Sequence, residues 1–257
     1  MRYLTLTIVL VAVLIGFAGS SPASSEPQQA TPVKVDNMSV AELEKAGDGA
    51  RVTKAYDEAI VYYQAAIRKD KKNATLYNKL GLAQLKANDP PSARLSFEKA
   101  VKRNSKYADA MNNLGAVYFV QKNHSAAARY FKKAVALDET RPVFHVNLAA
   151  AWFGQNKLDR AMAEYNRALQ LDPTILDQRY SGGMTAQVST AEERARYNYM
   201  LAKLYARLGD TEQCLRCLKK AKEEGYHNLA NVYKDEEFSH LRQDPRMAEI
   251  APPPSPK

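Results

Sequence analysis

The chain has few of the residues that carry most enzyme chemistry and metal binding. Its 257 residues include only two cysteines and four histidines. The histidines are far apart and match no metal-ligand spacing; they are His124, His145, His227 and His240. No phosphate-binding lysine motif, nucleophile–base pair or acid–base pair of carboxylates can be identified. The sequence therefore predicts a protein that is not an enzyme and that binds no metal and no cofactor.

Both cysteines fall in one motif, Cys214-Leu215-Arg216-Cys217. A C-x-x-C motif at the start of a helix can be redox-active, but no thioredoxin-like alternation of strand and helix surrounds this one. Cys214 also stands at a position that is alanine in the other repeats described below. We interpret the pair as structural, and a reducible disulfide and thiol–disulfide redox activity remain the alternatives.

Long apolar runs are also scarce, and the one candidate lies at the N-terminus. Residues 3–18 form an apolar stretch of about 16 residues behind Arg2, whereas a membrane-spanning helix needs about 20. Ala18 and Ser20 have the small side chains that a signal peptidase requires, and no nearby cysteine supports a lipid anchor. We therefore expect a signal peptide, with an uncleaved membrane anchor as the alternative.

The sequence does contain a repeat of 34 residues. The columns that keep this interval are Ala59/Ala93/Ala127/Ala161, Ala66/Ala100/Ala134/Ala168, Tyr63/Phe97/Phe131/Tyr165, Leu80/Leu114/Leu148 and Gly81/Gly115. Apolar residues recur every three or four positions within a repeat, which predicts two helices joined by a turn. The small residues let the two helices approach closely. One such unit buries too little apolar surface to fold alone, so the units are expected to stack.

This pattern resembles the tetratricopeptide repeat family. The family's Leu-Gly pair, its following aromatic residue and its later Ala, Phe and Ala are matched by Leu80-Gly81, Leu114-Gly115-Tyr118, Leu148-Trp152, Ala127-Phe131-Ala134 and Ala161-Tyr165-Ala168. The family's terminal proline is matched only at Pro173. The resemblance implies an all-α, right-handed α-solenoid of about five helix-turn-helix units with a short helical C-terminal cap. It also implies that the protein holds other proteins.

The repeat register divides the chain into consecutive segments. They are a signal peptide at 1–20, a disordered leader at 21–39, a divergent unit at 40–73, units at 74–107, 108–141 and 142–175, a linker at 176–194, a unit at 195–228, a cap at 229–250 and a disordered tail at 251–257. Gly47 and Gly49 are expected to make the first helix of the divergent unit irregular. Thr190 and Glu193 have the spacing of a capping box, which predicts a helix start there.

In such a solenoid the first helices of the units line a concave inner surface. Asparagine amides there can pair with the backbone of an extended peptide, and aromatic rings can hold its apolar side chains. The residues predicted to be exposed on this surface and to contact a peptide are Asn78, Asn112, Asn113, Phe119, Val146, Asn147, Phe153 and Tyr199. The alternative is that the asparagines satisfy neighbouring backbone groups. Val143 and Asn147 stand where the family's clamp for C-terminal carboxylates has cationic residues, so that clamp is not expected.

The formal net charge of +9 at pH 7 bears on the class of partner. Several positive residues lie in the last turns of second helices, where their charge interacts favourably with the negative end of the helix dipole. A second interpretation is that these residues attract acidic partners or anionic membranes. No nucleic-acid recognition motif is present. We predict a non-catalytic scaffold that binds protein or peptide ligands in its concave groove and is exported to the periplasm or cell envelope. The alternative is a membrane-anchored or self-assembling spacer, and the oligomeric state is not predicted.

Overall fold

In the computed structural model, the described residues, 35–176 and 190–253, form α-helices and short 3-10 helices and contain no strand. No helix in these ranges is long and apolar enough to cross a membrane. The chain divides into an N-terminal unit that ends at Tyr118 and a C-terminal unit that begins at Phe119. The predicted signal peptide, most of the predicted leader and linker, and the end of the predicted tail lie outside the described residues.

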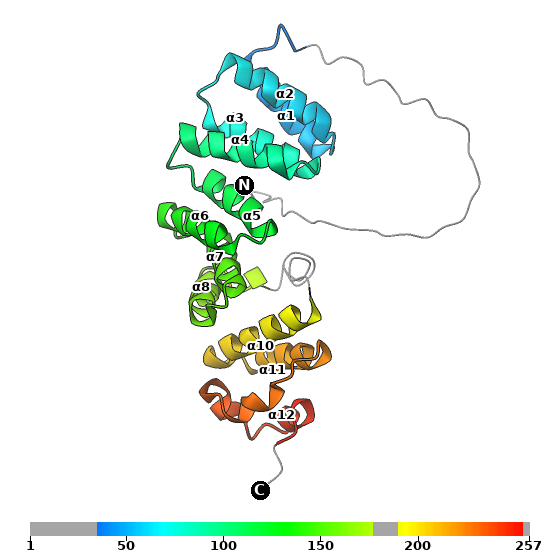
Figure 1. Cartoon of the computed structure of the whole chain (residues 1–257), viewed down its shortest axis with the longest axis vertical. Helices are drawn as coiled ribbons and strands as arrows, with labels where there is room; N and C mark the ends of the chain where they lie inside the picture. Colours follow the sequence, from blue (N-terminus) through cyan, green and yellow to red (C-terminus); the bar gives the residue numbers. More distant parts are fainter. Residues whose placement is uncertain (1–34, 177–189, 254–257) are drawn as a thin grey trace, which may run out of the picture. The chain divides into compact units, whose positions relative to one another are not determined.

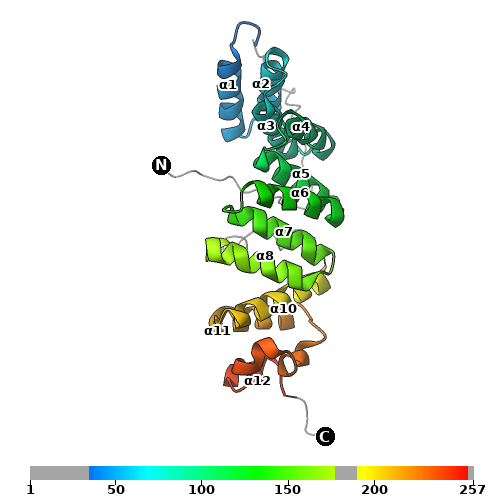
Figure 2. The ribbon, with the colours of Figure 1, turned by 90° about the vertical axis from the view of Figure 1, so that its left-hand side faces the viewer.

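The N-terminal unit is built from helices that pack in consecutive pairs (Figure 1). Helix α1 (Val40–Val52) packs on α2 (Tyr56–Lys69), and α3 (Ala74–Lys86) packs on α4 (Pro90–Arg103). Helix α2 also packs on α3, which joins the two pairs, as the turned view in Figure 2 shows. The next first helix is α5 (Ala108–Val120), whose last two residues already belong to the C-terminal unit.

The C-terminal unit continues the same arrangement. Helix α7 (Pro142–Gly154) packs on both α6 (His124–Leu137) and α8 (Leu158–Leu171). After the segment that is not described, α10 (Ala191–Arg207) packs on α8 and pairs with α11 (Thr211–Glu223). The predicted all-α class is therefore confirmed, and the capping box of Thr190 and Glu193 starts α10 as predicted.

Short helical segments follow the last helix pair and cover it. The 3-10 helices η1 (Leu229–Tyr233) and η2 (Glu236–Leu241) contact α11 and α10 respectively, and α12 (Pro245–Ile250) contacts α11. Val232, Phe238 and other apolar residues of these segments join the buried cluster of the unit. The segments η1, η2 and α12, referred to below as the cap, thus cover apolar surface that a further repeat would otherwise cover.

The turn inside each helix pair uses one repeated backbone conformation. Lys54, Asn88, Lys122 and Asn156 follow one another at intervals of 34 residues and have φ between 58° and 64°. A residue in this left-handed conformation commonly follows the end of a helix. It turns the chain out of the helix axis while the last carbonyl oxygens of the helix still accept hydrogen bonds. Gly209 has the same role after α10, with φ of 75°.

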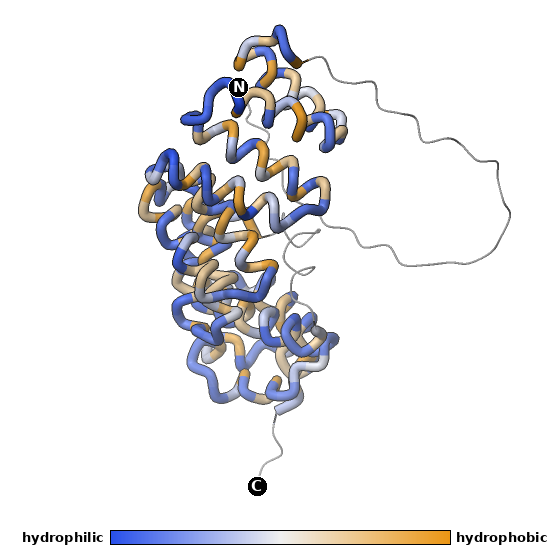
Figure 3. The backbone as a smooth tube through the Cα atoms, turned by 45° about the horizontal axis from the view of Figure 1, so that its top comes forward, coloured by the Kyte–Doolittle hydropathy of each residue, from blue (hydrophilic) through white to orange (hydrophobic). Residues whose placement is uncertain are grey.

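The close packing of paired helices depends on glycine facing an aromatic ring. A Cβ atom at Gly81 would lie 2.6 Å from Cε1 of Phe97, and one at Gly47 would lie 2.6 Å from Cε1 of Tyr63. Both rings are fully buried. Along the helices in Figure 3, apolar and polar residues alternate from turn to turn, as expected for helices that bury one side.

The predicted irregularity of the first helix is therefore wrong. Helix α1 is continuous through Gly47 and Gly49. Gly47 is the residue that receives the Tyr63 ring, 34 positions before Gly81, so it belongs to the repeat rather than interrupting it.

We predict that Gly81→Ala destabilises the protein, because the added methyl group would overlap the Phe97 ring. The free energy of unfolding should fall by about 1–3 kcal/mol, the usual cost of overpacking a core. Urea unfolding followed by circular dichroism measures this change.

Gly49→Ala is the matched control, since Gly49 is exposed on α1 and has no atom within 4 Å of a built Cβ. This substitution should stabilise the protein by up to about 1 kcal/mol through helix propensity. If both variants changed stability equally, the glycine–aromatic packing would not determine the close approach of the helices.

Candidate binding surface

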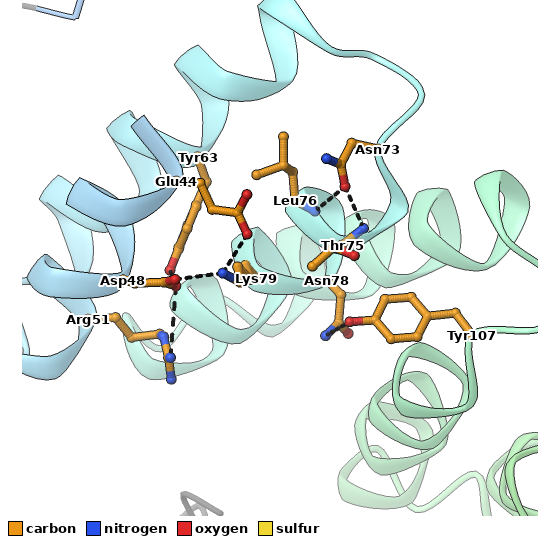
Figure 4. A network of polar contacts seen from close by, with 10 residues as sticks. All are labelled: Glu44, Asp48, Arg51, Tyr63, Asn73, Thr75, Leu76, Asn78, Lys79 and Tyr107. Atoms are coloured by element: carbon orange, nitrogen blue, oxygen red, sulfur yellow. Dashed lines mark hydrogen bonds and ion pairs between the residues drawn. The ribbon is translucent and has the colours of Figure 1, made fainter. Parts of the chain in front are cut away.

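A polar network connects the first helices of the N-terminal unit (Figure 4). Lys79 Nζ on α3 lies 2.6 Å from both Glu44 Oε1 and Asp48 Oδ2 on α1. The Tyr63 hydroxyl on α2 donates to Asp48 Oδ1 at 2.7 Å. Burial lowers the pKa of Lys79, but its hydrogen bonds to the two carboxylates outweigh this effect, so the pKa is raised overall. The network fixes α1, α2 and α3 to one another.

A second set of contacts shows that Asn78 is a structural residue. Its side-chain nitrogen donates to the Tyr107 hydroxyl at 3.3 Å, and its oxygen accepts from Asn113 Nδ2 at 2.9 Å. Only 5 % of Asn78 is exposed. The predicted exposure of Asn78 is therefore wrong, because both ends of its amide join α3 to the start and middle of α5.

The predicted exposure is also wrong for two residues of the C-terminal unit. Val146 is fully buried and belongs to the unit's main apolar cluster. Tyr199 is 5 % exposed, because its ring stacks on Tyr226 with centroids 4.3 Å apart and its hydroxyl donates to Asp235 Oδ2 at 2.8 Å. The segment that leads into the cap therefore covers the position at which a peptide contact was expected.

The remaining predicted contact residues are half-buried, and these are Asn112, Asn113, Phe119, Asn147 and Phe153. Asn112 and Asn147 each take part in an interaction within the folded chain. Their roles in peptide binding stay predictions.

Two of these residues, together with His124, form an aromatic patch at the start of the C-terminal unit. The Phe119 and His124 rings lie 5.1 Å apart, and a Cβ at Gly154 would be 2.7 Å from His124 Cγ. His124 therefore lies between Phe119 and the end of α7, where Phe153 precedes Gly154. We refer to Phe119, His124 and Phe153 as the aromatic patch.

A guanidinium group stands at the edge of the aromatic patch. Arg196 Cζ on α10 lies 5.9 Å from the centre of the Phe153 ring, which suits a cation–π contact. The same guanidinium donates to the side-chain oxygen of Asn156. The Phe153 ring also contacts Tyr197, which meets it edge-on at 5.5 Å. The surface thus combines partly exposed aromatic rings with a fixed positive charge.

His124 keeps the aromatic patch uncharged near neutral pH. Burial lowers the pKa of His124, and nearby Lys122 lowers it further, whereas Glu193 acts in the opposite direction. Its Nδ1 atom is buried and has no hydrogen-bond partner among the described residues. An imidazole in this setting contributes apolar surface rather than charge. Sequence reasoning did not select His124, because it begins a second helix and lies outside the inner-surface positions. Arg196 does stand at an inner-surface position, the second of its unit, but it was not among the predicted peptide contacts.

His145 is held in the protein interior, whereas His227 and His240 are exposed. His145 is buried, with Nδ1 2.7 Å from Glu164 Oε2 and Nε2 3.0 Å from the Glu139 carbonyl oxygen. Across residues 35–176 and 190–253, no group of three or more His, Cys, Asp or Glu side chains gathers in a form that could hold a metal ion.

The two cysteines are buried thiols without a disulfide between them. Burial raises the pKa of Cys214 to about 12, and Cys217 and Asp210 add to the shift. Because the thiolate is the reactive form, this environment opposes nucleophilic and redox chemistry.

We predict that the native thiols react slowly with Ellman's reagent at pH 7.5. Modification should be slower by more than about a hundredfold than in urea-unfolded protein, since both burial and the raised pKa of Cys214 reduce access to the thiolate. Stopped-flow absorbance on native and unfolded protein gives the two rates. Rapid modification of the native protein would instead support the redox alternative.

Comparison with family models shows matches to one family along most of the folded chain. Models described as tetratricopeptide repeat match residues 78–142, 118–187 and 195–224, and a model described as TPR repeat matches residues 53–88. Comparison with curated proteins gives no significant match.

Solved structures show the same fold. The MamA protein is 21% identical with a TM-score of 0.53, and the match covers 77% of this chain and 95% of that one. YrrB, described as a TPR protein with an unusual peptide-binding site, is 21% identical with a TM-score of 0.52, over 76% of this chain and 91% of its own. MamA from Desulfovibrio magneticus RS-1, residue 41 to the end, is 18% identical with a TM-score of 0.53, over 73% and 95%. At these identities the likeness concerns the fold.

Proposed function

The chain belongs to the tetratricopeptide repeat family, and from this premise we propose that it binds partner peptides at the aromatic patch of its C-terminal unit. The family and the fold support a protein–protein interaction scaffold. Proteins of this family are generally non-catalytic, and we propose the same for this chain.

The observation that carries the proposal is the composition of the aromatic patch. Phe119 and Phe153 are partly exposed, although the apolar cluster against which they pack is buried. Arg196 adds a positive charge beside Phe153. Aromatic residues and arginine contribute most to the affinity of protein interfaces. A peptide with an apolar side chain next to a carboxylate suits this surface, which agrees with an acidic partner.

The asparagine side chains have less capacity to bind a peptide than the sequence suggested. Asn78 is fully engaged in the fold, and Asn113 uses its side-chain nitrogen to bind Asn78. The proposed peptide site therefore depends on apolar and charged contacts, with Asn147 on α7 as the remaining polar candidate in the same unit.

Phe119→Ala/Phe153→Ala should reduce recovery of partner proteins at least tenfold, because two aromatic interface residues that each contribute about 1 kcal/mol together exceed the ~1.4 kcal/mol of a tenfold change in affinity. Quantitative mass spectrometry of proteins that co-purify from the source cells measures the recovery. Arg196→Glu should give a similar loss for acidic partners without removing an aromatic ring.

Leu158→Ala is the control variant, since Leu158 is a 38% exposed apolar residue on α8 outside the aromatic patch. Thermal unfolding shows whether each variant remains folded. Unchanged recovery with folded Phe119→Ala/Phe153→Ala protein would remove the peptide-binding role of the aromatic patch.

We propose export to the periplasm or cell envelope on the basis of residues 1–20, and N-terminal sequencing of the protein from its native cells tests this. Cleavage after the small residues near Ala18 and Ser20 should give a start close to Ser21. An intact Met1 in the membrane fraction would contradict cleavage and favour the alternative, a membrane-anchored spacer.

A further inference from the structure

The N-terminal unit contains a cavity of about 410 Å³ that is wide open to solvent and that the proposed peptide site does not use. It lies between α2 and α4, over α3, and shares no residue with the polar network of Figure 4. Volumes of about 300–1,000 Å³ are typical of pockets that hold a ligand or an inserted side chain.

The cavity exists because α3 lacks an aromatic ring that the later first helices have. Tyr118, Trp152 and Tyr205 occupy the same position in their first helices, and Gln84 occupies it in α3. The Tyr118 hydroxyl donates to Glu98 Oε1 at 3.3 Å, so the Tyr118 side chain reaches from α5 to α4, the second helix of the preceding repeat. An equivalent ring on α3 would extend towards α2 and occupy the space between α2 and α4.

Gln84 leaves this space unfilled because its side chain binds elsewhere. Its Oε1 atom accepts from the Ser96 hydroxyl on α4 at 2.7 Å, and both residues are at least nine-tenths buried. Within the described part of the chain, the Gln84 side-chain nitrogen has no hydrogen-bond acceptor. The cavity wall therefore includes an amide donor that a ligand could use.

The rest of the lining is apolar and positively charged. Ile67, Tyr77 and Leu80 contribute apolar surface, and Leu95 at the rim is 50% exposed. Val61, which stands 34 positions before Leu95 on α2, is also 40% exposed. Large apolar side chains left exposed beside a cavity are typical of a surface that contacts another protein.

The charges lie at one end of the cavity. Arg68 on α2 and Lys99 on α4 both line it, and no carboxylate does. Neither cation forms an ion pair with any described residue. Arg68 follows Ile67 and Lys99 precedes Ala100, and both Ile67 and Ala100 pack with Tyr77, so the cations lie on the Tyr77 side of the cavity. Gln84 lies at the other end, where it binds Ser96, and Lys99 is about one helical turn along α4 from Ser96. Seven residues of α3 separate these two ends, which corresponds to about 10 Å at 1.5 Å per residue.

We propose that this cavity is a second docking site, which takes a helical segment of a protein partner carrying one aromatic residue and one acidic residue. The aromatic side chain occupies the space of the missing ring beside Gln84, where a tyrosine hydroxyl can accept from the free amide. The acidic side chain, two helical turns away, pairs with Arg68 and Lys99. The site belongs to the other unit and is independent of the aromatic patch.

The test uses four fluorescein-labelled, alanine-based helical peptides of 15 residues. One carries Tyr and, seven residues along, Glu; the others replace Tyr with Ala, Glu with Lys, or both. Fluorescence anisotropy with the full-length protein should show that the Tyr–Glu peptide binds at least tenfold more tightly than each of the other three. Equal binding of all four peptides, or no binding up to millimolar concentration, would overturn the proposal.

Gln84→Tyr is the decisive variant, because it restores the ring that the later repeats have. It should weaken binding of the Tyr–Glu peptide at least tenfold while the melting temperature is unchanged or raised. Arg68→Glu/Lys99→Glu should reverse the preference in favour of the Lys peptide. If a folded Gln84→Tyr protein bound the Tyr–Glu peptide as the wild type does, the cavity would not be the docking site.

Two control variants show whether peptide binding depends on this cavity alone. Lys102→Glu changes the charge of a residue on α4 outside the cavity and should leave binding unchanged. Phe119→Ala/Phe153→Ala should also leave it unchanged, so failure of one site is distinguishable from failure of the other. Sedimentation tests for self-association: a dimer that Gln84→Tyr abolishes would assign the cavity to a second copy of this chain and overturn the proposal.

Discussion

The contact between a small residue on a first helix and an aromatic ring on its paired second helix is the constraint on which the structure depends. The space between glycine and ring has no room for even one additional carbon atom, both for Gly47 facing Tyr63 and for Gly81 facing Phe97. This contact sets how closely the helices approach, and the ring in it is fully buried. Stacking of pairs follows, since each pair alone leaves apolar surface exposed.

The same packing decides which side chains remain available for a partner. Polar residues on neighbouring first helices bind one another, as Lys79 does with Glu44 and as Asn113 does with Asn78. They thereby stabilise the stack and lose most of their capacity to bind a ligand. Binding is left to residues that the stack only partly covers, and the rings of Phe119 and Phe153 are of this kind.

Departures from the repeat have local consequences that differ with position. Cysteine in place of alanine at position 214 changes little, because a buried thiol of this size behaves as a small apolar group. Glutamine in place of an aromatic residue at position 84 removes a ring and leaves a cavity. The repeat therefore tolerates a change in chemistry at a small position, whereas a loss of volume at a large position alters the surface.

The sequence by itself determined the all-α class, the pairing of helices and several helix starts, since periodic apolar residues and capping boxes act locally. It did not determine which inner positions are exposed. Three residues in the register of surface residues are in fact buried, and these are Asn78, Val146 and Tyr199. Asn78 binds Tyr107 and Tyr199 binds Asp235, and both partners lie far away in sequence. The burial of Val146 depends on how its whole helix packs in the apolar cluster. The cavity beside Gln84 was likewise decided only by tertiary structure, because an unfilled volume depends on where the side chains of three helices point.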